Sequence, residues 1–188
     1  GYADEWIEEA KRRGLLNLPT TADTLPCYLN QKNIELFERH KIFTASELRS
    51  RYEILLENYS KVLRIEARTM IHMAAKHYIP AAITCTTRLG DSISAVSAAC
   101  PGADVSVQKS LLERVSSCLA EASAALEQLK LLMARVDAIE DMEEMAHAYH
   151  DAVVPAMAAL RIPVDEMELL VDKDIWPVPT YGDLMFEV

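Results

Sequence analysis

Apolar residues recur at helical spacing along this chain, most regularly between residues 112 and 136. They step by three and four residues alternately over more than three heptads: Leu112, Val115, Leu119, Ala122, Leu126, Leu129, Met133 and Val136. This spacing keeps one seam facing a neighbouring helix, as in a coiled coil. The pattern predicts a long helix, and burial of Leu126 or Leu129 in its seam should contribute about 1.5–3 kcal/mol each.

A second long helix is predicted to begin after residue 44. Thr44 and Glu47 have the spacing of a capping box, in which each side chain bonds the other's backbone N–H. The apolar pattern reaches about Tyr78 and continues past Pro80 without a turn signal, so a kink is favoured over a stop. Residues 90–104, which hold Gly, Pro and several Ser, predict a loop.

A third long helix is predicted over 140–160, with a bend at Pro155. Pro163 is expected to open a last short helix that reaches about Lys173. Before the long helices, the pattern predicts helices over 3–13 and 24–40. Gly14 ends the first of these, and a loop over 15–24 separates the two.

The predicted fold class is all-α: a long antiparallel bundle of three long helices with additional short helices and an extended C-terminal tail. Composition agrees, because 51% of residues are hydrophobic but only 6% are aromatic, with 5 Gly in all. Three segments are expected: short helices and loop over 1–43, the long-helix bundle over 44–173, and the tail over 174–188.

The last thirteen residues have an unusual composition for a chain end. Two prolines, Pro177 and Pro179, disfavour a helix and favour an extended path. The aromatic residues Trp176, Tyr181 and Phe186 make the segment too apolar for a free tail. We therefore expect these three side chains to dock against a surface, either the bundle or another domain.

The net charge of −10 argues against nucleic acid or an anionic membrane as a partner. The four cysteines, Cys27, Cys85, Cys100 and Cys118, form no CxxC pair and are expected to be reduced, mostly buried thiols of a cytoplasmic protein. No signal peptide or membrane span is evident. Because the chain starts Gly-Tyr-Ala without Met, it is interpreted as an excised fragment.

Three charged residues stand close together in an otherwise apolar stretch. Glu66 interrupts the apolar stripe of its helix, with Arg64 and Arg68 on either side. Either a partly buried carboxylate paired with arginine or an interruption of the seam at this point would explain this pattern. We favour such a structural ion pair over a catalytic role.

A possible metal motif lies further along the chain. Glu144 and His147 form an ExxH, the spacing found in di-iron bundles, but no second copy occurs. His147, His150 and Asp151 are expected to be exposed polar residues rather than a pH-sensitive pair. No phosphate-binding loop, dinucleotide fingerprint, zinc motif or nucleophile elbow occurs. The sequence therefore predicts no catalytic, cofactor-binding or metal residue in this chain.

Several motifs, in one order, resemble the C-terminal part of the type III glutamine synthetases. They are RGLLNLPTT at 13–21, IELF at 34–37, SRYEI at 50–54, IEARTM at 65–70 and WPVPTYGDLMF at 176–186. The resemblance covers essentially the whole chain, although 88–150 adds little. It implies a structural and assembly domain that is inactive alone.

The resemblance also implies the properties of a parent enzyme. That enzyme joins ammonia to glutamate with ATP, uses Mg or Mn, and works as a double-ring homo-oligomer. Its catalytic domain would lie upstream, so no catalytic residue is assigned in this chain. The alternative is an independent helical bundle that acts as a binding module or a di-iron carboxylate protein, and two irons per purified chain would favour it.

Overall fold

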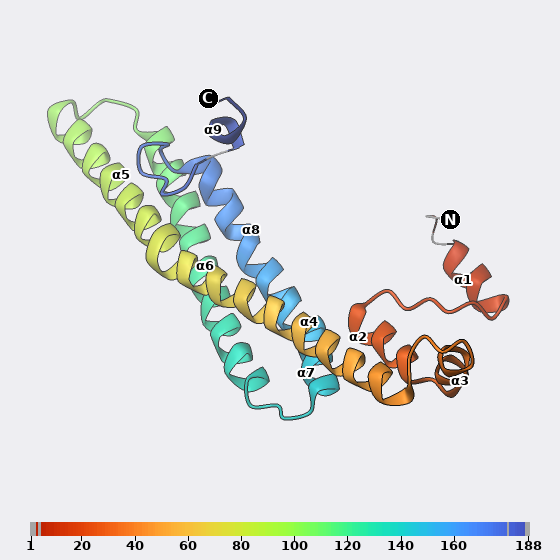
Figure 1. Cartoon of the computed structure of the whole chain (residues 1–188). Coiled ribbons are helices and arrows are strands. Elements are labelled where there is room, and N and C mark those ends of the chain that lie inside the picture. The colour runs from red at the N-terminus through yellow and green to blue at the C-terminus, as the bar shows by residue number, and fades with distance from the viewer. Residues whose placement is uncertain (1–2, 4, 180, 187–188) are drawn as a thin grey trace. The chain divides into compact units, whose positions relative to one another are not determined.

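The computed structural model describes residues 3, 5–179 and 181–186, and these residues form helices and connecting segments without a strand (Figure 1). The predicted all-α fold class is confirmed. Contacts divide the chain into two compact units. Unit 1 comprises residues 1–63 and 139–151, and unit 2 comprises 64–138 and 152–188. This division follows contacts in space, whereas the three segments expected from the sequence follow chain order.

Unit 2 is built around the predicted coiled-coil helix, α6, which spans Ser106–Val136. α5 (Ile79–Ala99) and α8 (Val154–Leu170) both pack against α6. α5 and α6 run in opposite directions, joined by a short connection, and α8 returns along α6 (Figure 1). The last third of α4 (Ala45–Met73), from residue 64 onward, also belongs to this unit.

The core of unit 2 contains the predicted seam of α6. Six of the eight predicted positions are buried, and the other two, Leu112 and Leu119, are half-buried. Opposing helices contribute Ala81 and Ala82 from α5 and Leu160 and Met167 from α8. Small alanines on α5 permit close approach, while the larger residues of α8 fill the other side. The helix predicted most strongly by its pattern is therefore the central helix of the unit.

Two prolines are accommodated by π-helical turns. η2 (Ala74–Tyr78) precedes Pro80, and η3 (Tyr149–Val153) precedes Pro155. A proline clashes with the carbonyl four residues before it, and in both cases that carbonyl lies within the wider π turn. The Ile79 N–H accordingly donates to the Ala74 carbonyl, five residues back. The predicted continuation of the helix past Pro80 is confirmed.

Unit 1 holds the N-terminal elements and the first two thirds of α4. These are α1 (Glu5–Arg12), α2 (Thr21–Thr24), η1 (Leu25–Leu29) and α3 (Gln31–Arg39), and α7 (Met142–Ala148) packs against α2. A cluster formed by Ala22, Leu25, Leu56 and Ala146 is buried, with Tyr52 and Tyr59 packed against it. Residues far apart in the sequence thus form one small core.

The ends of the N-terminal elements are set by local chemistry. The Thr44–Glu47 capping box is confirmed: the Thr44 N–H donates to Glu47 Oε2 at 2.8 Å, and the Glu47 N–H donates to Thr44 Oγ1 at 3.3 Å. Gly14 follows α1 with φ 70°, a conformation that favours glycine. The predicted stop of the first helix at Gly14 is therefore also confirmed.

Two N-terminal predictions were wrong. Residues 21–24 are helical rather than loop, because Thr20 Oγ1 accepts the Asp23 N–H at 3.0 Å and caps the turn. The single helix predicted over 24–40 is broken at Asn30, whose ψ of 133° is extended. The Asn33 side-chain amide donates to the Cys27 carbonyl at 2.6 Å and holds the break.

Three further predictions were wrong in unit 2. Residues 90–99 continue α5 instead of forming a loop, and the helix ends at Ala99, where Cys100 turns extended before Pro101. Pro163 lies inside α8, because a continuous buried face with Leu160 and Met167 outweighs the lost backbone bond. The tail is only partly extended: α9 (Tyr181–Phe186) forms beyond the two prolines.

Candidate docking site

Trp176 packs closely against the helices of unit 2. Its side chain is 7% exposed and its ring stacks on Tyr78 of η2, with centroids 5.1 Å apart and planes at 18°. Stacked rings at this separation add to the energy of burial. The indole N–H is buried and has no hydrogen-bond partner in the described part of the chain. Trp176 therefore fixes the start of the tail against η2.

A groove of about 390 Å³ lies beside this stacked pair. We call it the tail groove. Its apolar walls come from α4, η2, α8 and the tail. They include Met70 and Met73 of α4, Leu160 and Val164 of α8, and Val178 and Leu184 of the tail. The volume falls within the range of ligand-sized pockets.

The polar residues of the tail groove carry more negative than positive charge. Arg161, Asp165 and Glu168 of α8 line it, and Arg161 Nε donates to Asp165 Oδ2 at 3.0 Å. Burial raises the pKa of the Tyr78 hydroxyl, and the carboxylates of Glu168 and Asp165 raise it further. The phenol therefore remains neutral at physiological pH beside two carboxylates.

The end of the tail is tethered but largely exposed. Lys173, which follows the end of α8, forms an ion pair with Asp183 of α9. Phe186, expected to dock, is 79% exposed, and Leu184 and Met185 are exposed as well. The side chain of Tyr181, the third predicted docking residue, lies outside the described part of the structure. Of the two predicted docking residues whose side chains the structure describes, Trp176 is buried and Phe186 is exposed.

The arginines flanking Glu66 pair with a different carboxylate. Arg64 Nε lies 3.0 Å from Asp137 Oδ1, and Arg68 Nη2 donates to Asp137 Oδ2 at 2.9 Å. Glu66 itself is exposed and takes part in no salt bridge within the described residues. The predicted partly buried ion pair of Glu66 is therefore not formed. Arg64 and Arg68 of α4 instead pair with Asp137 at the end of α6, while Glu66 is exposed.

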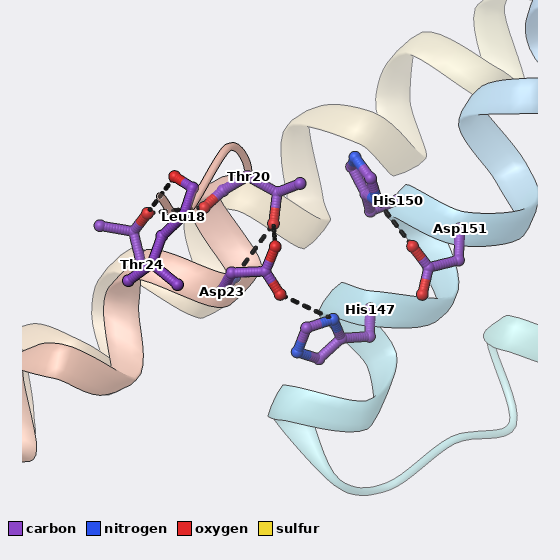
Figure 2. Close-up of polar contacts among 7 residues, drawn as sticks. All are labelled: Leu18, Thr20, Asp23, Thr24, His147, His150 and Asp151. Carbon is purple, nitrogen blue, oxygen red and sulfur yellow. Dashed lines mark hydrogen bonds and ion pairs between the residues drawn. The ribbon is translucent and has the colours of Figure 1, made fainter. Parts of the chain in front are cut away.

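The ExxH segment lies in a polar junction of unit 1 (Figure 2). His147 Nδ1 is 3.9 Å from Asp23 Oδ1, and Asp23 in turn accepts a hydrogen bond from the Thr20 hydroxyl at 2.6 Å. His150 Nδ1 lies 2.7 Å from Asp151 Oδ1. Within the described residues, no three His, Cys, Asp or Glu side chains are grouped as metal ligands. The junction connects α2 to α7.

The four cysteines are free thiols. Cys85 and Cys118 are buried, Cys27 is half-buried and Cys100 is exposed. Burial raises the pKa of the Cys118 thiol, with Glu121 and Glu166 adding to the effect. A raised pKa keeps the thiol protonated and unreactive. Among the described helices, none combines the length and apolar composition needed to cross a bilayer.

Comparison with known proteins identifies the family. The family described as glutamine synthetase C-terminal domain matches residues 1–97, just over half of the chain. This chain belongs to that family. The match covers η2 and the α4 wall of the tail groove, whereas the α8 wall and the tail lie beyond it.

Relatives of this glutamine synthetase C-terminal domain cover the remainder. A glutamine synthetase of Butyrivibrio fibrisolvens is 36% identical over 188 residues, which is all of this chain and 27% of the relative. A type-3 glutamine synthetase of Dictyostelium discoideum is 31% identical over 195 residues, covering 99% of this chain and 26% of the relative. A Bacteroides fragilis glutamine synthetase is 28% identical over 190 residues. The predicted resemblance to type III enzymes is confirmed, and the chain spans about a quarter of these relatives.

Sequence reasoning missed three residues that shape the sites of this glutamine synthetase domain. Asp137 follows the last seam residue of α6 and carries no local signal of its two arginine partners. Tyr78 and Glu168 meet only because η2 and α8 pack beside each other. Trp176, by contrast, was identifiable as an apolar residue in a proline-rich tail.

Proposed function

We propose that this chain is the structural and assembly domain of a type III glutamine synthetase and has no ligase activity by itself. The observation that carries the proposal is the match to the glutamine synthetase C-terminal domain family, with relatives aligned over 99–100% of the chain. A helical unit with exposed apolar residues on α8 and α9, including Ile162, Leu169 and Phe186, suits a packing role.

The proposed parent is a cytoplasmic enzyme that joins ammonia to glutamate. ATP phosphorylates the γ-carboxylate of glutamate, and ammonia then displaces phosphate from the acyl phosphate to give glutamine. In this proposal a catalytic domain upstream in the same chain supplies the ATP site and the Mg or Mn ligands. The parent assembles as a double-ring homo-oligomer, to which this domain contributes packing surface.

An activity assay tests the catalytic half of the proposal. The 188-residue chain and the full-length parent are assayed side by side for glutamate- and ammonia-dependent phosphate release from ATP with Mg or Mn. We expect turnover from the parent and background release from the chain alone. Turnover by the chain above background would overturn the proposal.

Assembly is tested separately by sedimentation. The parent is compared with a version that lacks these 188 residues, at equal concentration and with circular dichroism to establish that both are folded. We expect the truncated protein to sediment as a smaller species. An unchanged assembly would show that this domain is not needed for it.

A further inference from the structure

We propose that the tail groove is the docking site for a segment of the parent protein outside these 188 residues. The docked segment inserts an apolar side chain between α4, α8 and the tail, and places a lysine or arginine beside Glu168. This inference rests on the proposed function, because it requires a parent chain that continues beyond this one.

The first support is apolar surface that unit 2 itself leaves uncovered. Leu184 lines the groove and is 70% exposed, and the next two residues, Met185 and Phe186, are 71% and 79% exposed. Consecutive exposed apolar residues are unfavourable in water unless they serve an interface. A segment that entered the groove would cover Leu184 from the open side.

The charge of the groove selects the kind of segment. Arg161 and Asp165 neutralise each other through their 3.0 Å contact. Glu168 is half-buried and forms no salt bridge within the described residues, so the groove residues that the structure describes carry one net negative charge. Partial burial makes an unpaired carboxylate unfavourable and strengthens its attraction to a cation. Electrostatic complementarity therefore favours a basic residue.

Trp176 lies behind the Tyr78 wall of the groove. Its indole N–H is buried without an acceptor in the described part of the chain, whereas buried donors normally have partners. Stacking on Tyr78 holds the ring and the tyrosine wall rigid, so the groove needs little ordering before it binds.

The remaining parent chain is favoured over a second copy as the occupant. The chain spans only 26–27% of its relatives, so about three quarters of a comparable protein lies outside it. A second copy also carries a net charge of −10, and like charge opposes its approach to an acidic groove.

Chemical footprinting tests the inference. Carboxyl labelling of Glu168 and oxidation of Met70 and Met73 are measured in the isolated chain and in the full-length parent. We expect all three rates to fall at least about fivefold in the parent, the loss of access that burial of a groove produces. Labelling of Glu127, an exposed carboxylate of α6, serves as the internal reference and should not change.

A charge reversal tests the chemistry of the docked segment. In the full-length parent, Glu168→Lys should restore oxidation of Met70 and Met73, and Glu168→Gln should restore part of it. Glu127→Lys introduces the same charge change on α6 and should leave the protection intact. Circular dichroism of each variant establishes that the helices remain folded.

Three outcomes would overturn the inference. Equal labelling in chain and parent would show an open groove, and protection that survives Glu168→Lys would exclude the basic residue. Protection that appears in the isolated chain as its concentration rises would assign the groove to a second copy. Each can occur while the parent still needs this domain for assembly, so failure here is distinguishable from failure of the proposed function.

Discussion

At the residue scale, the hydroxyl of Tyr52 connects α4 to α7. It donates to Glu143 Oε2 at 2.7 Å, and burial together with this carboxylate raises the pKa of Tyr52 to about 12. The fold thus favours the neutral phenol over the phenolate. The ordinary pKa of tyrosine is 10.0. The contribution of Tyr52 to folding stability is therefore complete below pH 10 and is lost as pH rises toward 12.

The pH dependence can be measured by ultraviolet titration of the tyrosines. We expect Tyr52→Phe to remove one tyrosine that ionises late in the native protein, and to reduce the loss of stability between pH 10 and pH 12. At neutral pH the lost hydrogen bond should cost about 1 kcal/mol. A variant with an unchanged number of late-ionising tyrosines would contradict this assignment.

A second residue-scale prediction separates Asp137 from Glu66. Asp137 contacts both Arg64 and Arg68, whereas Glu66 is exposed. Asp137→Asn should lower the free energy of unfolding, measured by urea denaturation, by about 0.5–1 kcal/mol, because both arginines are partly exposed. Glu66→Gln should change the free energy of unfolding by no more than about 0.5 kcal/mol relative to the unsubstituted chain. A larger effect at Glu66 would support the ion pair expected from the sequence alone.

At the scale of elements, the sequence identified the helices better than their ends. The α6 seam was readable because eight apolar positions repeat without interruption, and burial follows that repeat. The break at Asn30 could not be predicted because it depends on the side-chain hydrogen bond from Asn33 to the Cys27 carbonyl. The continuation of α8 through Pro163 could not be predicted because it depends on burial of one helix face in the fold. Pro80 and Pro155 marked where the helices continue past a proline, but the π turns that accommodate these prolines were not predicted.

Two leucines two residues apart on α6 test the seam directly. Leu129 is fully buried and Leu131 is 56% exposed. Leu129→Ala should cost about 2–5 kcal/mol, through lost burial and the cavity that remains. Leu131→Ala should change the free energy of unfolding by no more than about 0.5 kcal/mol. Similar effects at both positions in urea unfolding would mean that the seam is assigned to the wrong face.

At the scale of the whole molecule, the resemblance of dispersed motifs identified the family, while the division into two units could not be predicted. Three crossings of the chain, at residues 63–64, 138–139 and 151–152, separate the units, and two of them fall inside continuous helices. No composition shift marks a boundary inside a helix. The units are therefore a property of packing, and they give the tail a defined place: all of its described contacts lie in unit 2.

This placement predicts where the loss of the tail should be felt. Deleting residues 175–188 removes Trp176 from Tyr78, exposing a wall of η2 and the adjoining face of α8. Removal of one buried tryptophan side chain costs about 3–5 kcal/mol. We expect a lower thermal midpoint, and faster amide hydrogen exchange in η2 and α8 than in α2 and α7. Phe186→Ala, at a largely exposed position of the same tail, should leave the thermal midpoint and the exchange rates unchanged.

Uniformly faster exchange across both units would show that they unfold as one cooperative structure. An unchanged exchange pattern would show that Trp176 does not stabilise unit 2.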